Sequence, residues 1–202
     1  MRFWYAPSYF FNYSFPNVVA VFYERYPNTH AKHILSEDVL SREITDDQIV
    51  TRKLIVKKSA TFLNSIPKWM SRLASVQYVP TIEESIFDRR KNTLVSYTRN
   101  IAWRTTLKLD EKCTYMPSAD GSRTELHRAL SVFVDYGRLS SFIERVVLGA
   151  FKNSIKKSVA GFNEKLQERC GRFQSPANQT PDRPPPLKTN FVQNGGLKWD
   201  KA

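Results

Sequence analysis

The chain has 202 residues, which is enough for one domain with a substantial core and a tail. Its 41% hydrophobic and 13% aromatic content is typical of a globular protein and excludes a wholly disordered one. The net charge of +12 favours an anionic partner: nucleic acid, a membrane surface or a small ligand. Residues 172–202 hold five Lys/Arg and two Asp, so only +3 of this charge belongs to the tail and most of it belongs to the folded part.

Cysteine usage and apolar runs exclude further classes. Cys113 and Cys170 are too few for a disulfide framework, and the sequence has no CxxC pair or Cys/His cluster for a metal. No apolar run approaches the roughly 20 residues that span a bilayer. Residues 1–15 show no clear signal core or cleavage site, so they are interpreted as the first strand of the fold and not as a targeting signal.

A strand at 8–14 and a short helix are predicted first. Ser14 suits the N-cap of this helix, apolar residues follow at helical spacing, and Pro27 requires the helix to end before it. Arg25 lies seven residues after Val18, on the apolar side of the helix. It is either a helix-end cation whose stem reaches water, or a guanidinium directed inward to a negatively charged group.

The region from His33 to about Tyr136 is predicted to be an antiparallel meander with one solvated face. The predicted strands are 34–44, 48–58, 76–87, 93–103, 104–116 and 122–134. The segment 59–75 is too long for a hairpin turn. It is either a short helix that covers the core or a lid whose apolar side chains touch a ligand or a membrane.

Residues 138–170 are predicted to form one long helix with two apolar stripes on roughly opposite sides. The first comprises Leu148, Phe151, Ile155, Val159, Phe162 and Leu166, and the second comprises Leu139, Ile143, Val146 and Ala150. The second stripe continues as Asn153, Ser154 and Lys157, which face either solvent or the polar end of a ligand. The Pro-, Asn- and Gly-rich residues beyond the helix predict a disordered tail.

No enzyme or nucleic-acid motif is present in the sequence. HExxH, GxSxG and P-loop patterns are absent, as are zinc-finger and RNP-like patterns. Glu83 and Glu84 are neighbours in a predicted strand, so their side chains point to opposite faces and make a weak pair for acid/base chemistry. His30 is interpreted as a surface residue.

The sequence resembles the PRELI domain family over residues 1–172. The resemblance rests on FYERYPNTHAKHILSEDVLSREI at 22–44, KKS at 57–59, IPKW at 66–69, IEESIFD at 82–88, SYTRNI at 96–101, DEKCTY at 110–115 and FKNSIKKSVAGF at 151–162. It implies an α+β helix-grip fold, similar to phosphatidylinositol transfer proteins. A curved antiparallel sheet of about seven strands and a long C-terminal helix would enclose a lipid cavity under an Ω-loop lid. Residues 1–172 would be the PRELI domain and 173–202 the disordered tail.

The resemblance also implies a function. A non-enzymatic protein would carry phosphatidic acid between the outer and inner mitochondrial membranes, through the intermembrane space, in support of cardiolipin synthesis. It would work as a heterodimer with a small twin-CX9C protein, at anionic membrane surfaces, with no cofactor, metal or nucleic acid. The PRELI-type branch, which KHILSEDVLSREIT favours, implies phosphatidic acid; the slowmo-like branch implies phosphatidylserine. A basic nucleic-acid-binding or adaptor domain is the alternative from another class. The mitochondrial location rests on the resemblance, since no presequence is visible.

Carried over residue by residue, the resemblance also implies a site. The family's head-group contacts fall on Arg25, His33, Lys58, Ser154 and Lys157. Asn153 is an additional candidate, because the helix position that is often Asn in the family is Ser154 here. Arg25 and His33 are expected to form one wall of a phosphate pocket and to face Lys157 across the cavity. The lid residues expected to contact membrane are Ile66, Pro67, Lys68, Trp69 and Met70.

Overall fold

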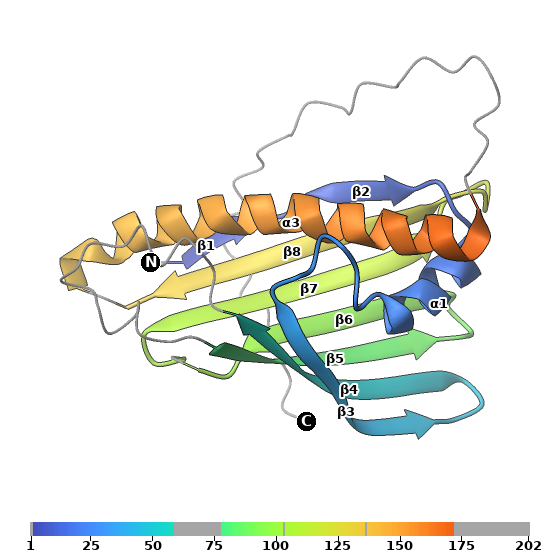
Figure 1. Cartoon of the computed structure of the whole chain (residues 1–202), viewed down its shortest axis with the longest axis horizontal. Helices are drawn as coiled ribbons and strands as arrows, with labels where there is room; N and C mark the ends of the chain where they lie inside the picture. The colour runs from blue at the N-terminus through green and yellow to red at the C-terminus, as the bar shows by residue number, and fades with distance from the viewer. Residues whose placement is uncertain (1, 59–77, 103, 136, 172–202) are drawn as a thin grey trace, which may run out of the picture.

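The computed structural model describes residues 2–58, 78–102, 104–135 and 137–171. Figure 1 shows one antiparallel sheet with a long helix lying across it. The elements, in chain order, are β1 Arg2–Tyr5, β2 Ser8–Phe11, α1 Phe15–Glu24, β3 Ile34–Ile44, β4 Gln48–Lys58, β5 Tyr78–Asp88, β6 Thr93–Asn100, β7 Leu107–Pro117, β8 Thr124–Val134, the 3-10 turn Gly137–Leu139 and α3 Ser140–Cys170. The predicted lid at 59–75, with Ile66, Pro67, Lys68, Trp69 and Met70, and the predicted tail at 173–202 lie outside the described residues.

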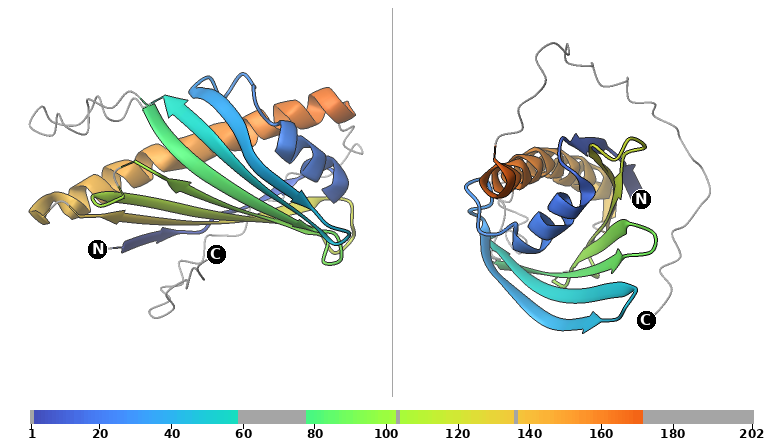
Figure 2. Two further views of the ribbon diagram at one scale, coloured as in Figure 1. Left: turned by 90° about the horizontal axis from the view of Figure 1, so that it is seen from below. Right: turned by 90° about the vertical axis from the view of Figure 1, so that its right-hand side faces the viewer.

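Seven strands follow one another across the sheet in the order β1-β8-β7-β6-β5-β4-β3, and all neighbours are antiparallel. This confirms the predicted meander and its α+β class. The N-terminal strand is split in two: β1 pairs with residues 130–133 of β8, and β2 pairs with residues 124–127. Figure 2 shows that the sheet is curved, so that its inner face surrounds α1 and one side of α3.

The boundary between β6 and β7 differs from the prediction for a local reason. The predicted strands nearly met at residues 103 and 104, but β6 ends at Asn100 and β7 begins at Leu107. The Asn100 side-chain amide donates to the carbonyl of Leu107 at 2.9 Å, and its oxygen accepts from the amide of Leu109 at 2.9 Å. The buried side chain of Asn100 therefore forms hydrogen bonds with backbone groups that would otherwise pair longer strands.

The first helix follows the predicted signals. Ser14 precedes it in an extended conformation, Pro16 lies in its first turn, and Arg25 closes it. The peptide bond between Tyr26 and Pro27 is cis, and the chain turns there toward β3. The apolar side of α1 is fully buried: Phe15, Val18, Val19, Val21 and Phe22.

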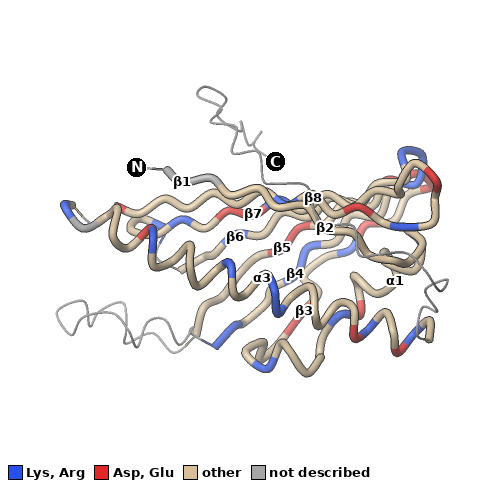
Figure 3. The backbone as a smooth tube through the Cα atoms, turned by 90° about the horizontal axis from the view of Figure 1, so that it is seen from above, with Lys and Arg blue, Asp and Glu red and all other residues tan. Residues whose placement is uncertain are grey.

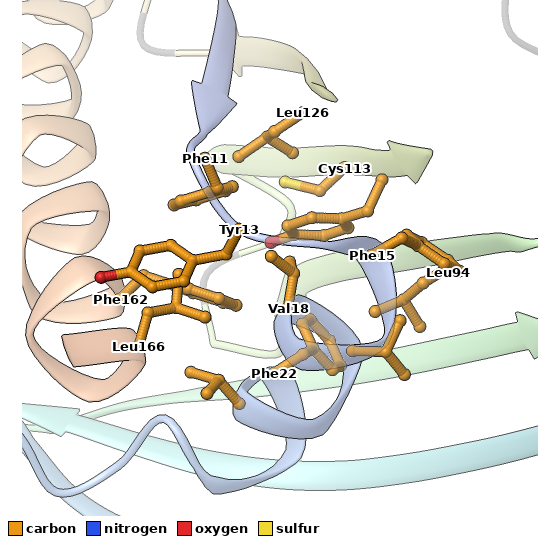
Figure 4. Close-up of a cluster of buried hydrophobic side chains, with 13 residues drawn as sticks. Phe11, Tyr13, Phe15, Val18, Phe22, Leu94, Cys113, Leu126, Phe162 and Leu166 are labelled. Atoms are coloured by element: carbon orange, nitrogen blue, oxygen red, sulfur yellow. The ribbon is translucent and has the colours of Figure 1, made fainter. Parts of the chain in front are cut away.

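Two apolar clusters hold α3 against the sheet. The first joins β2, α1, the middle strands and the C-terminal half of α3, and Figure 4 shows Phe11, Phe22, Phe162 and Leu166 packed together there. The second joins β7, β8 and the N-terminal half of α3, through Leu107, Leu130, Val132, Val134, Ile143, Val147 and Leu148. Both clusters lie on the inner face of the sheet, so α3 is fixed at two places along its length.

The helix wheel is right for the first stripe of α3 and only partly right for the second. Leu148, Ile155, Phe162 and Leu166 are buried. In the second stripe Ile143 is buried, but Val146 is half-buried, and Val147 is buried beside it. Successive residues of a helix are rotated by about 100°, so the side of α3 that packs on the sheet is centred nearer to Val147 than to Val146. No described helix is long and apolar enough to cross a membrane.

Candidate functional site

A band of polar side chains crosses the inner face of the sheet between the two apolar clusters. The strand register places Lys53 opposite Glu83, Glu83 opposite Thr98, and Thr98 opposite Glu111. The next row runs through Thr51, Ser85, Ser96, Cys113 and Arg128. The buried members of these two rows include Lys53, Glu83 and Arg128. Buried polar groups are costly unless they are paired, so this band is a candidate site.

A cavity of about 90 Å³ lies over this band, between the sheet, the end of α1 and α3. Its lining includes Arg25, His33, Lys57, Glu83, Glu111 and Ser154. These residues come from α1, from four strands or their flanking loops, and from α3. The fold therefore brings together side chains that are more than a hundred residues apart in sequence.

Arg25 is directed inward, as the sharper of the two sequence interpretations expected. It is 8% exposed, lines the cavity, and donates from Nη1 to the carbonyl of Phe22 at 2.9 Å. Its guanidinium carbon lies 4.3 Å from the centre of the Phe22 ring and 4.9 Å from that of Tyr26. Its Nη2 donates to Oε2 of Glu83. The partner of Arg25 in this structure is thus a carboxylate of the protein itself.

The charge state of Arg25 follows from that pairing. Burial by itself would lower the pKa of the guanidinium, but the nearby acidic groups, Glu83 foremost, together raise the pKa well above its ordinary value. Arg25 therefore stays charged inside the cavity, and Glu83 compensates the cost of burying it.

Two more ion pairs balance the polar band. Lys53 contacts Glu37 at 2.8 Å, and Arg128 contacts Glu111 at 2.8 Å. Each of the three buried cations here, Arg25 at the end of α1 and Lys53 and Arg128 in the band, is matched by a carboxylate within the described residues. Among the buried side-chain atoms that have no hydrogen-bond partner within the described residues are Oε1 of Glu83 and Nε of Arg128, and both residues line the cavity.

The outer edge of the cavity carries further basic side chains. His33 is exposed there, and Lys57 lines the cavity beside it. The pKa of His33 is lowered from its ordinary value, first by partial burial and then by Lys57 and Lys157. Lys157 therefore lies near enough to His33 to act on its charge. At neutral pH this edge presents two ammonium groups around a neutral imidazole.

The loop between α1 and β3 is fixed to α3, and it positions both Arg25 and His33. Asn28 donates from Nδ2 to the carbonyl of Arg25 at 2.7 Å, and its Oδ1 accepts from the amide of His30 at 3.0 Å. Thr29 and His30 both contact Glu164 of α3. His30, interpreted from sequence as a surface residue, is exposed and also lines the cavity.

The predicted contacts occupy three kinds of position. Arg25, His33 and Ser154 line the cavity. Asn153 and Lys157 are exposed on α3 outside the lining, with Lys157 near His33. Lys58 is exposed at the end of β4, where its backbone amide donates to the carbonyl of His33 at 2.7 Å. Successive strand residues point to opposite faces, and it is Lys57 that lines the cavity. The head-group role of these residues stays a prediction.

Sequence reasoning missed the acidic side of the cavity. Glu83 and Glu111, and the Arg128 that pairs with Glu111, were not among the predicted site residues, although both carboxylates lie in motifs that carried the family resemblance. The alternation of strand residues did indicate that one of Glu83 and Glu84 faces inward. Which of the two it is depends on the register with β4, which sequence periodicity does not set.

The thiol that lines the described cavity is unreactive. Cys113 lines it, but burial, followed by the charge of Glu111, raises the pKa of the thiol to about 12, so it stays protonated and is a poor nucleophile. Among the described residues no group of His, Cys, Asp and Glu could hold a metal ion. The arrangement offers cations and hydrogen-bond donors to an anionic ligand.

A curved antiparallel sheet that holds one long C-terminal helix, with a polar cavity between them, defines a helix-grip protein. Solved structures agree with this class. TTHA0849 from Thermus thermophilus superposes with a TM-score of 0.56 at 12% identity, over 83% of this chain and 99% of its own. The structure of Ara h 8.0201 superposes with a TM-score of 0.52 at 11% identity, over 83% and 99% of the two chains. At these identities the likeness concerns the fold alone.

The sequence comparison is more specific. The model of the PRELI-like family matches residues 16–172, which is most of the chain. PRELI domain-containing protein 1, mitochondrial, from Homo sapiens is 34% identical over 166 residues, which are 80% of this chain and 74% of that protein. Protein UPS2, mitochondrial, from Saccharomyces cerevisiae is 31% identical over 165 residues, or 79% and 70% of the two chains. The chain belongs to the PRELI-like family, as its motifs indicated.

Proposed function

We propose that this protein is a mitochondrial phospholipid transfer protein that carries phosphatidic acid between the outer and inner membranes and catalyses no reaction. Its family membership and the names of its relatives, which call them mitochondrial, support the class and the location. The observation that carries the proposal is the cavity between α3 and the sheet, where Arg25, His33 and Lys57 converge.

The size and lining of the cavity favour a head group as its occupant. Pockets that hold a whole organic ligand measure about 300–1,000 Å³, whereas this cavity measures about 90 Å³. Removing a two-chain lipid from a bilayer exposes roughly 30 methylenes at about 0.8 kcal/mol each, so the acyl chains need apolar cover as well. We therefore assign the described cavity to the head group only.

Phosphatidic acid fits the charges at the cavity edge. Its phosphomonoester carries more than one negative charge near neutral pH and offers three acceptor oxygens, which suit a guanidinium and ammonium groups. Arg25 would bind it from the inner side, and His33, Lys57 and Lys157 from the edge, with Ser154, Asn153 and Lys58 as further predicted contacts.

Phosphatidylserine is the second candidate, and one observation favours it. Oε1 of Glu83 is buried at the cavity and accepts no hydrogen bond from the protein. The ammonium group of a serine head group would supply a donor to it, whereas a fully ionised phosphomonoester has none.

The proposed cellular setting extends the same function. The protein would work in the intermembrane space as a heterodimer with a small twin-CX9C protein, at anionic membrane surfaces and in support of cardiolipin synthesis. The predicted membrane contacts Ile66, Pro67, Lys68, Trp69 and Met70 belong to this part of the proposal.

A liposome transfer assay with defined lipids, with and without the twin-CX9C partner, tests the proposal. We expect phosphatidic acid to move, and Arg25→Gln to slow its transfer about tenfold or more, because a charge-assisted contact is lost and Glu83 is left unpaired. Arg52→Gln is the matched control, since Arg52 lies on the outer face of β4 in a contact with Glu84. Transfer of phosphatidylserine alone would contradict the cargo. Failure to move either lipid would contradict the function.

A further inference from the structure

We propose that Glu83 is a built-in competitor of the ligand's anionic group. In the unliganded protein its carboxylate occupies Arg25, and it thereby sets how tightly a phosphate group is held and how fast it leaves. The proposal rests on the proposed function, because the competing anion is taken to be the phosphate of a phospholipid.

Glu83 lies where it can compete with a ligand for Arg25. Glu83 lies in the middle of β5, is 5% exposed, and lines the cavity together with Arg25. A carboxylate offers about four acceptor positions on two oxygens. Oε2 accepts from Arg25, whereas Oε1 accepts nothing from the protein. One oxygen therefore holds the carboxylate to Arg25, and no second protein donor fixes it in place.

The charge of Glu83 opposes the binding of a phosphate at Arg25. A phosphate that enters the cavity and approaches Arg25 comes within a few ångströms of Glu83, because the two side chains are in contact. Two anions at that separation in a partly desolvated site repel strongly. The phosphate therefore binds Arg25 only at the expense of the Glu83 contact, so the carboxylate lowers the net affinity for every anionic head group.

The neighbouring strand offers Glu83 a second position. Lys53 is directly opposite Glu83 in the β4–β5 register, where cross-strand side chains lie about 5 Å apart at their Cβ atoms. Lys53 is buried and now contacts Glu37. A displaced Glu83 carboxylate can turn toward this ammonium group and stay paired. Arg25 thus has a partner when the cavity holds no ligand, and the carboxylate has one when a phosphate arrives.

The test measures the binding of a soluble lipid to the full-length protein. Dioctanoyl phosphatidic acid is titrated into wild type and Glu83→Gln, and dissociation rates are measured in parallel. We expect Glu83→Gln to bind about tenfold more tightly and to release the lipid more slowly, because removing a repelling charge at contact distance is worth roughly one decade or more. Dioctanoylglycerol, which lacks the phosphate, should show no such gain.

Glu84→Gln is the matched control. It makes the same change of charge one residue further along the strand, but Glu84 faces the other side of the sheet and contacts the exposed Arg52 at 3.0 Å. We expect its affinity to stay within about twofold of wild type, since a screened surface charge acts weakly over this distance. An equal gain in Glu84→Gln would overturn the proposal, because it would show a general effect of net charge.

Two more variants keep the test decisive if Glu83→Gln unfolds. Glu83→Asp keeps the charge and withdraws the carboxylate by one methylene from Arg25, so it should tighten binding in the same direction by a smaller factor. The double variant Arg25→Gln/Glu83→Gln has no unpaired charge in this pair, and it should bind phosphatidic acid more tightly than Arg25→Gln alone, because the repelling carboxylate is gone. Unchanged or weaker binding in both single Glu83 variants overturns the proposal.

The outcomes separate this inference from the function it rests on. Wild type that binds and transfers phosphatidic acid, with Glu83 variants that bind no more tightly, contradicts the inference alone. Wild type that neither binds nor transfers phosphatidic acid contradicts both. Weaker binding of dioctanoyl phosphatidylserine by Glu83→Gln would assign Glu83 to the serine ammonium group and would also overturn competition.

Discussion

Arg25 and His33 both lie at the cavity, but Arg25 stays charged whereas the neutral form of His33 is favoured. Arg25 is buried and stays charged because Glu83 and aromatic rings surround it. His33 lies at the cavity edge among cations, where partial burial, Lys57 and Lys157 favour its neutral form. A phosphate group would reverse the balance at His33, because a nearby anion stabilises the imidazolium.

His33 should therefore report both Lys157 and the ligand. In a proton NMR titration between about pH 5 and 8, we expect its pKa below the ordinary 6.5. The pKa should rise toward that value in Lys157→Gln and rise further when dioctanoyl phosphatidic acid binds. Lys152→Gln is the control, because Lys152 lies over the Tyr5 ring instead. A pKa of His33 that is the same in Lys157→Gln and in wild type would contradict the proximity of the two residues.

The same shift fixes the sign of a stability effect. Because the folded pKa of His33 lies below the unfolded one, the unfolded chain takes up the proton first as the pH falls. The stability that neutral His33 contributes is complete above 6.5 and is lost as the pH falls through the lowered pKa. In thermal unfolding at a series of pH values, His33→Gln should lose less stability between about pH 7 and 5 than wild type. Equal losses in the two proteins would contradict the shift.

At the level of single residues, the sequence predicted which way a side chain faces better than it predicted which residue the side chain contacts. Helical spacing placed Arg25 on the apolar side of α1, and the structure confirms that it is directed inward. Its partner Glu83 is 58 residues away in sequence and meets it only through the curvature of the sheet. Local periodicity contains no information on that contact, so the acidic half of the site could not be predicted.

Among the elements, α3 is in close contact with the loop that follows α1. Its two glycines differ sharply in surroundings. A Cβ atom on Gly149 would meet no other atom within 4 Å, whereas one on Gly161 would collide with the side-chain amide of Asn28. The loop after α1 therefore lies directly on α3 at Gly161, and this close approach positions Arg25 and His33.

Alanine substitutions at the two glycines should have opposite effects. Gly149→Ala should raise the free energy of unfolding by about 0.5–1 kcal/mol, because alanine is the better helix former. Gly161→Ala should lower it by about 1–3 kcal/mol, because overpacking outweighs the helix propensity. Urea unfolding followed by circular dichroism measures both. A stabilised Gly161→Ala would show that the loop moves away at little cost.

The sheet elements were predictable because alternation and turn residues are local signals. The six strands between Ile34 and Val134 begin and end within a few residues of the prediction wherever the structure describes them. The split between β1 and β2 was missed, because it arises from pairing with β8, more than a hundred residues later. Long-range pairing of this kind has no counterpart in a short sequence window.

For the molecule as a whole, the distribution of charge matters more than its sum. The polar band inside is balanced by ion pairs, so the excess of positive charge in the described residues lies outside it. Figure 3 shows Lys and Arg spaced along α3. Arg145, Lys152 and Lys156 are exposed there, and residues 145–163 contain no Asp or Glu. This outer face of α3 has the charge that an anionic membrane attracts.

The exposed lysines of α3 should accordingly strengthen the attachment of the protein to anionic vesicles. Each Lys near such a surface contributes about 1 kcal/mol, so Lys152→Gln with Lys156→Gln should weaken association about tenfold or more in a vesicle sedimentation assay. Arg90→Gln with Lys91→Gln is the matched pair, since those cations lie in the β5–β6 turn beside Asp47 and Asp88 and their field is already neutralised. The difference between the two pairs should shrink as salt shortens the screening length. An equal loss in both would mean that vesicles respond to the net charge of the protein and not to the face of α3.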